Sequence, residues 1–138
     1  MPVLRIAASV IVVEGRMLLV RKRGTDAFMQ PGGKLEAGES GAECLVRELE
    51  EELALRIPVA VLEPLGRYGA LAANEPDHVV DCEVFRVPAA AIEGQPIAVQ
   101  AELEELRWSD ATDLAELAAA GRLAPLTRDH LGRFLGEG

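Results

Sequence analysis

The residues from 33 to 55, GKLEAGESGAECLVRELEEELAL, constrain the fold of this chain more than any other stretch. Within them, apolar residues recur at three- and four-residue spacing, which predicts that 41–53 is an amphipathic helix with one face on a core. Ser40 and Glu43 have the spacing of a capping box, so the helix is expected to begin just after Ser40. The residues expected on its buried face are Ala42, Leu45, Val46, Leu49 and Leu53.

A neighbouring face of this predicted helix carries three carboxylates, because Glu48, Glu51 and Glu52 stand at i, i+3 and i+4. Like charges at this spacing weaken a helix, and a cation bound among them removes that penalty. Mg²⁺ and Mn²⁺ prefer oxygen ligands, and Mg²⁺ commonly binds through a few carboxylates together with substrate phosphates. The alternative is a solvated acidic face, which is our interpretation of Glu43 and Glu50.

A glycine turn precedes the helix. Gly32 and Gly33 follow Pro31, and two glycines let the backbone turn sharply and approach a ligand closely. Residues 34–36 are expected to form a short strand after the turn. The sequence therefore predicts a tight turn that leads into a helix bearing a carboxylate cluster.

The spacing of residues in this stretch resembles the Nudix box, whose family hydrolyses nucleoside diphosphates linked to another group. The matching positions are Gly33, Glu39, Arg47, Glu48, Leu49, Glu51, Glu52 and Leu55. Ala54 departs from the pattern, because the family usually has Gly at this place, just past the helix, where a left-handed residue is often needed. We expect Ala54 to cost up to about 1 kcal/mol or to change the helix exit, and not to affect the ligands.

The resemblance implies a metal site with Mg²⁺ as the cofactor and Mn²⁺ as a substitute. The implied ligands are Glu48, Glu51 and Glu52, with the Gly32 carbonyl as a candidate fourth. By the same resemblance, Arg47 would hold the glutamates and Glu39 in place, and Glu39 would assist the metal site.

The general base stays open between Glu48 and a glutamate of the last predicted strand. In the family, a Glu a few residues before a Trp often completes the metal site or acts as the base. Glu102 matches this spacing before Trp108 best, and Glu105 is its rival. The structural alternative for this acidic run is a solvated strand end.

Three residues are candidates for substrate binding. Arg23 ends the densest basic cluster, Arg21-Lys22-Arg23, and is favoured as a phosphate contact because it leads into the glycine loop; the alternative is an exposed strand end. Phe28 either stacks on a base or fills the core beneath the loop, and core packing is favoured. Lys34, inside the box, is the third candidate.

Length and charge limit the class of protein. We expect 138 residues to form a single domain spanning 1–138. A net charge of −9 argues against a nucleic-acid polymer as partner, but not against a small phosphorylated substrate, because divalent cations reverse the local sign. No apolar run approaches the ~20 residues of a membrane span, and no signal peptide is recognisable. Two cysteines, Cys44 and Cys82, do not make a disulfide framework, so the cytoplasm is the expected compartment.

The order of elements predicts an α/β fold with a mixed sheet between helices. The expected strands are 3–13, 16–23, 34–36, 78–87 and 102–108, with a further strand in 56–68 that its prolines confine to an edge or an irregular path. The expected helices are 41–53, 111–119 and 127–135. Residues 69–77 are a loop candidate that could reach the substrate, and 88–101 are expected to be mostly loop. The Nudix resemblance implies the family's α/β/α sandwich and, by family analogy, a homodimer.

The expected activity is metal-assisted hydrolysis of a phosphoanhydride, with a nucleoside triphosphate, (d)NTP, as the default substrate. The residues do not identify the leaving group, because fold and box give the chemistry and not the rest of the substrate. One alternative is a non-catalytic Nudix-like domain that binds or senses a nucleotide. Another is an acidic interaction domain whose helix face is only solvated.

Overall fold

The structure is a computed structural model, which describes residues 1–137. Its strands are β1 (Val3–Val10), β2 (Val12–Val13), β3 (Arg16–Lys22), β4 (Gly32–Lys34), β5 (Glu63–Leu71), β6 (Val79–Arg86) and β7 (Leu103–Ser109). They form one sheet in the order β4-β1-β6-β5 and another in the order β2-β3-β7. β1 is parallel to β6 and antiparallel to β4, so the predicted mixed sheet is confirmed.

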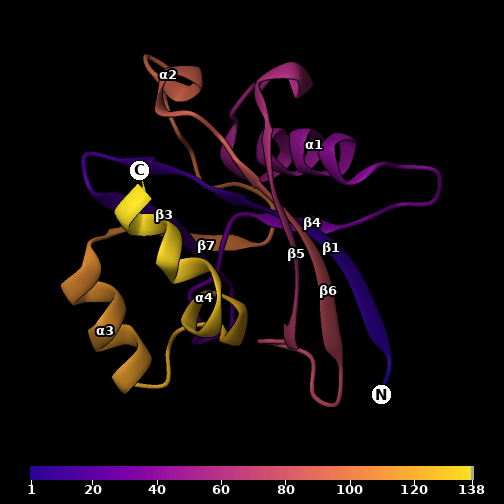
Figure 1. The fold of residues 1–138 in the computed structure, drawn as a ribbon, viewed down its shortest axis with the longest axis vertical. Helices are drawn as coiled ribbons and strands as arrows, with labels where there is room; N and C mark the ends of the chain where they lie inside the picture. The colour runs from indigo at the N-terminus through magenta and orange to yellow at the C-terminus, as the bar shows by residue number, and fades with distance from the viewer. Residues whose placement is uncertain (138) are drawn as a thin grey trace.

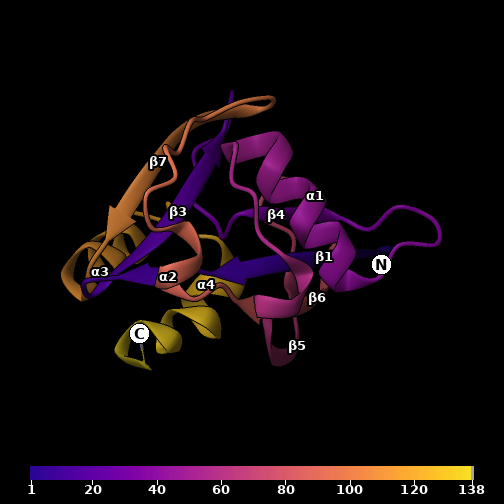
Figure 2. The same cartoon turned by 90° about the horizontal axis from the view of Figure 1, so that it is seen from above.

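Helices cover the strands on both sides. They are α1 (Gly41–Leu53), η1 (Val59–Val61), α2 (Ala89–Ile92), α3 (Ala111–Ala119), α4 (Pro125–Asp129) and η2 (Leu131–Glu137). α1 and α2 lie on one side of the strands, and α3 and α4 lie on the other (Figures 1 and 2). Among the helices of residues 1–137, none is both long and apolar enough to cross a membrane.

Each helical layer packs on its own apolar cluster. Beneath α1, the cluster includes Leu45, Leu49 and Leu53 together with Leu18 and Val20 of β3. Beneath α3 and α4, the cluster includes the alternate residues of β3, Met17 and Leu19. This division follows from the two-residue side-chain period of a strand. β3 therefore has one row of side chains facing α1 and another facing the C-terminal helices.

Several element boundaries differ from those expected. The predicted strand 3–13 is divided at Ile11, because β1 and β2 belong to different sheets. The predicted helix 127–135 is divided into α4 and η2 at His130, whose φ of −130° is not helical. The short strand after the glycine turn is β4 at 32–34, where Gly32 and Gly33 pair with β1, and not 34–36. α2 was not expected, and β5 extends into the predicted loop 69–77.

Candidate active site

The helix that carries the carboxylates is capped at both ends. The backbone N–H of Glu43 donates to Ser40 Oγ at 3.1 Å, and the Ser40 N–H donates to Glu43 Oε1 at 2.9 Å. These reciprocal bonds are the predicted capping box, and α1 begins and ends where the sequence places it. Ala54 adopts the left-handed conformation, with φ of 59°, and its N–H donates to the Glu50 carbonyl. Alanine therefore takes the conformation that usually favours glycine, at a small energetic cost.

Glu52 is the unusual side chain of α1, because it is a carboxylate that is only 6% exposed. Burial, together with the hydrogen bond and the negative charge of Glu48, raises the pKa of Glu52 to about 9. The charge of Glu102 acts in the same direction, whereas Lys22 lowers the pKa. The Glu48 and Glu52 carboxylates are expected to bind a cation, because its positive charge offsets the cost of burying Glu52 and the repulsion between the two carboxylates.

Arg47 joins the carboxylate face to the glycine turn. Its guanidinium donates to Glu39 Oε2 at 2.7 Å and Oε1 at 2.9 Å, and to Glu48 Oε1 at 2.8 Å. It also donates to the Lys34 carbonyl at 3.2 Å and to Glu51 Oε2 at 3.3 Å. The Arg47 hydrogen bond and charge hold the pKa of Glu39 down at about 2, so this pair stays ionised over the working pH range.

The two glycines of the turn allow close approaches that no other residue would. A Cβ on Gly32 would lie 2.1 Å from the Ala7 carbonyl oxygen of β1. A Cβ on Gly33 would lie 2.4 Å from Cδ of Glu48. Gly32 is thus required for pairing with β1, and Gly33 leaves the space that the Glu48 carboxylate occupies. The turn and the helix fit together around one acidic side chain.

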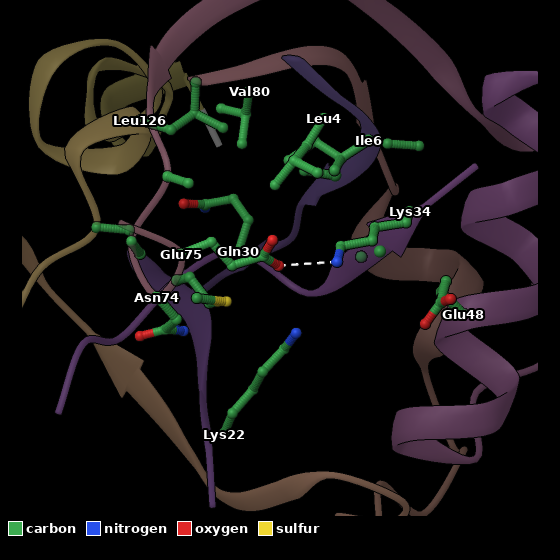
Figure 3. A pocket seen from close by; sticks show the side chains of 18 of the residues that line it. Leu4, Ile6, Lys22, Gln30, Lys34, Glu48, Asn74, Glu75, Val80 and Leu126 are labelled. Carbon is green, nitrogen blue, oxygen red and sulfur yellow. Dashed lines mark ion pairs between the residues drawn. The ribbon is translucent and has the colours of Figure 1, made fainter. Parts of the chain in front are cut away.

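A cavity of about 450 Å³ opens beside these groups. Its lining includes Glu52 and the three side chains that act on the charge of Glu52, namely Glu48, Glu102 and Lys22. Glu48 and Lys22 are labelled in Figure 3. Away from Glu48 its wall is mostly aliphatic and includes Leu4, Ile6, Met29, Val80 and Leu126. Residues 71–75, at the end of β5 and in the loop after it, cover one side, so the loop that was expected to reach the substrate does line the cavity. The cavity therefore joins an acidic surface to an apolar one.

The structure separates the candidates for phosphate contact. Arg23 is exposed, lies 3.4 Å from Glu104 and does not line the cavity; Lys22, its neighbour, does. Phe28 is fully buried, so it packs in the core, which is the alternative that the sequence favoured. The Cζ atoms of Arg107 and Arg122 lie 5.4 and 5.3 Å from the centroid of its ring. Lys34 lines the cavity and forms a 2.8 Å ion pair with Glu75, drawn in Figure 3.

Among the remaining glutamates, Glu102 lines the cavity and its charge acts on Glu52, whereas Glu105 accepts from Arg21 at 2.7 Å and does not line it. Glu51 is exposed and directed at Arg47, outside the cavity lining. Within the basic cluster the sequence favoured Arg23 over Lys22, and it did not single out Gln30 or Thr127, which also line the cavity. Lys22 has the same strand parity as Leu18 and Val20, and that signal places it on the α1 side.

The donor set fits a hard divalent cation. Glu48 and Glu52 supply carboxylate oxygen atoms side by side, and a buried carboxylate beside a second one is stabilised by such an ion. In residues 1–137, no three His, Cys, Asp or Glu side chains are already gathered as a ready-made metal cage. Mg²⁺ commonly completes its shell with waters and substrate phosphates, so a few protein oxygens suffice.

Comparisons with known proteins agree with this geometry. The NUDIX domain family matches residues 3–130. YvcI, an uncharacterized Nudix hydrolase of Bacillus subtilis strain 168, is 28% identical over 117 residues, 84% of this chain and 72% of YvcI. Isopentenyl-diphosphate Delta-isomerase of Cereibacter sphaeroides is 31% identical over 147 positions, 95% of this chain and 81% of the isomerase. The 8-oxo-dGTP diphosphatase of Escherichia coli K12 is 39% identical over 57 residues, 38% of this chain and 44% of that enzyme.

Solved structures show the same fold. A MutT protein from Methanosarcina mazei Go1 superposes with a TM-score of 0.73 at 23% identity, covering 99% of this chain and 95% of that one. A bifunctional NMN adenylyltransferase/ADP ribose pyrophosphatase from Francisella tularensis, complexed with AMP and a Mn ion, gives 0.69 at 17% identity, covering 99% and 42%. The expected α/β architecture is therefore confirmed.

Proposed function

Because this chain belongs to the Nudix family of pyrophosphohydrolases, which generally uses divalent metals, we propose that it hydrolyses a phosphoanhydride bond of a nucleoside triphosphate with Mg²⁺. The observation that carries the proposal is Glu52, a buried carboxylate beside Glu48 at one end of a large cavity. A pair of this kind is costly in a fold unless a cation or a proton compensates it.

Each group at the acidic end has a proposed role. Glu48, Glu51, Glu52 and the Gly32 carbonyl would hold Mg²⁺, with Mn²⁺ as a substitute; Glu51 must turn from Arg47 to do so. The bound ion would neutralise the phosphates and acidify an attacking water. Arg47, itself fixed by Glu39, orients Glu48.

Glu102 is the proposed general base, because it lines the cavity and Glu105 does not. Glu48 is already held by Arg47 at 2.8 Å and is better suited to ligation than to accepting a proton. Lys22 and Lys34 are the proposed phosphate contacts, with Lys22 in place of Arg23. The charge of Lys22 acts on Glu52, and Lys34 lines the same cavity while paired with Glu75. A phosphate chain across the ion would meet Lys22 first and would compete with Glu75 for Lys34.

A nucleoside triphosphate is favoured by the size of the cavity and by a relative. A volume of about 450 Å³ lies within the range of small-molecule sites, roughly 300–1,000 Å³. One relative is a diphosphatase named for 8-oxo-dGTP. The rest of the cavity extends beyond the carboxylates and offers space for the group attached to the phosphates.

The test is a panel of nucleoside di- and triphosphates, sugar nucleotides and dinucleotides with Mg²⁺, read as released phosphate or pyrophosphate. We expect turnover of triphosphates that disappears in EDTA and returns with Mg²⁺ or Mn²⁺. Glu52→Gln should lower kcat by a factor on the order of 10² or more, since it removes a metal ligand at constant shape. Glu50→Gln is the matched control, because Glu50 is exposed and lies 3.7 Å from Arg56. Nucleotide binding without turnover would indicate a sensor domain instead.

Isomerisation of isopentenyl diphosphate is the second candidate. It is favoured by the identity with the isomerase over 95% of this chain and by the aliphatic wall of the cavity, which would suit a short hydrocarbon group. The same panel therefore includes isopentenyl diphosphate, with product analysis for the rearranged double bond. Conversion of this substrate without phosphate release would replace the hydrolase proposal.

A further inference from the structure

Two buried polar side chains lie on the wall of the cavity away from the carboxylates. Gln30 is 6% exposed and Thr127, from α4, is 1% exposed. Thr127 Oγ1 donates to Gln30 Oε1, and Gln30 Nε2 donates to Met17 Sδ at 3.1 Å. Among the buried polar residues of the described chain, these two and Glu52 line the cavity. Since Glu52 belongs to the acidic end, Gln30 and Thr127 are the buried polar groups left for the rest of a ligand.

The surroundings of this pair are aliphatic. Leu4 is in register with Val80, and Ile6 follows two residues later on β1, so their side chains share one face of the sheet. Leu126 of α4 lines the cavity beside Thr127 (Figure 3). Within residues 1–137 the cavity has no aromatic lining residue, so a bound group is held by aliphatic contact and not by stacking. Its orientation must then come from hydrogen bonds.

The pair has hydrogen-bonding capacity left over. A glutamine amide has two N–H donors and an oxygen with two lone pairs, and a hydroxyl has two lone pairs. The contacts with Met17 and Thr127 use one donor and one lone pair of Gln30. One N–H donor and one acceptor therefore stand side by side on the amide, with the Thr127 hydroxyl oxygen as a further acceptor. A flat heterocycle with a donor next to an acceptor matches this pattern, whereas a hydrocarbon chain leaves it unpaired.

We propose that Gln30 and Thr127 read the hydrogen-bonding edge of a nucleobase in the aliphatic part of the cavity, which makes them the residues that select nucleotides over diphosphates of hydrocarbon groups. This rests on the proposed hydrolysis of nucleotides and specifies how the group attached to the phosphates is recognised. A site built around buried polar groups discriminates strongly against a ligand that lacks the matching groups, because those groups then lose solvent without gaining a partner.

The test compares a nucleoside triphosphate with ribose 5-triphosphate, which carries the same phosphate chain and sugar without a base. The wild-type protein should hydrolyse the nucleotide with a kcat/KM at least about tenfold higher, the value of one or two neutral hydrogen bonds. Equal kcat/KM for the two substrates overturns the inference, whatever the variants do.

The decisive variant is Gln30→Leu combined with Thr127→Val. Removing both partners leaves neither one buried and unpaired, which protects the fold. We expect kcat/KM for the nucleotide to fall roughly 10- to 100-fold, mainly through KM, while that for ribose 5-triphosphate is unchanged. Thr112→Val is the matched control, because Thr112 is an exposed threonine of α3. Melting temperatures are recorded for all variants.

The outcomes separate this inference from the proposed function. If both triphosphates lose activity equally in the double variant, the pair is only structural and the inference fails, whereas hydrolysis stands. If no triphosphate is hydrolysed by the folded wild-type protein, the proposed function fails first. Should the double variant not fold, the wild-type comparison of the two substrates still decides.

Discussion

Replacing Gly33 by alanine should abolish most activity and leave the fold intact. The added Cβ would lie 2.4 Å from Glu48 Cδ and 2.6 and 2.7 Å from its two carboxylate oxygens. Non-bonded carbon atoms in contact stand about 3.5–4.0 Å apart, so the carboxylate must move by about 1 Å. It is the end of a flexible side chain, and the φ of Gly33 is not left-handed, so the backbone can stay in place. A misplacement of about 1 Å at a reacting centre costs on the order of 10² in rate.

The assay measures kcat with the preferred triphosphate and saturating Mg²⁺, together with the melting temperature. Gly136→Ala is the control, because a Cβ there meets no atom within 4 Å. In a Glu48→Ala background, the Gly33→Ala change should have no further effect, since the side chain it displaces is absent. Near wild-type turnover of Gly33→Ala, or a further loss in the Glu48→Ala background, would refute the assignment of this turn as the support of Glu48.

Other perturbations distinguish the groups around the cavity. The pKa of Glu52 is about 9 in the fold against an ordinary 4.5, so in EDTA the free energy of unfolding should decline between these pH values. The contribution of Glu52 to the free energy of unfolding is complete below pH 4.5 and is lost as the pH rises through about 9, by at most about 1.4 kcal/mol per pH unit. Urea titrations measure this free energy, and its decline with pH should be weaker when Mg²⁺ is present. Glu102→Gln should lower kcat by about 10² or more, while Glu105→Gln, measured in parallel, leaves it unchanged. Glu75→Gln should lower the KM for a triphosphate a few-fold at low salt, because Lys34 no longer pairs with Glu75 at 2.8 Å; an unchanged KM would exclude Lys34 as a phosphate contact.

The bounds of α1 could be predicted from the sequence because the residues that define its two ends interact locally. Ser40 and Glu43 satisfy each other within one turn, and Ala54 ends the helix by its own backbone conformation. The same holds for α3, where the Asp110 side chain accepts from the Asp113 N–H at the predicted start. Spacing along one helix also brings Glu48 and Glu52 together without reference to the rest of the chain.

The favoured phosphate contact, Arg23, differs from the residue of the cluster that lines the cavity, because the end of a strand, unlike a helix, depends on its partner strand. β3 ends at Lys22, where its pairing with β7 shifts register, so Arg23 lies just past the paired part of the strand. Proximity to the glycine loop favoured Arg23, yet this side chain lies near Glu104, outside the cavity. Strand parity was the better signal, because Lys22 continues the row that faces α1.

The aliphatic half of the cavity was not foreseeable, because its parts come from distant places in the chain. Gln30 and Thr127 are 97 residues apart and meet only after α4 has packed over the sheet. Neither residue belongs to a motif, and α4 itself was predicted with different bounds. Contacts of such sequence separation leave no periodic or spacing signal.

The two ends of the cavity depend mostly on different helices, α1 and α4, and this has a functional consequence. The acidic end depends on α1 and the glycine turn, whose contacts are local and linked through Arg47. The selective end depends on α4, on the first residues of β1 and β6, and on Gln30, which stands just before the glycine turn. Substitutions at Gln30 or Thr127 should then alter substrate preference without changing the stabilisation that Mg²⁺ gives, and Glu52→Gln should do the reverse. Free-energy changes at independent sites add. The triple variant Gln30→Leu, Thr127→Val, Glu52→Gln should therefore lose an activation free energy, calculated from kcat/KM, equal to the sum of the losses of the double variant and of Glu52→Gln. A large deviation from this sum would show that the two ends are coupled.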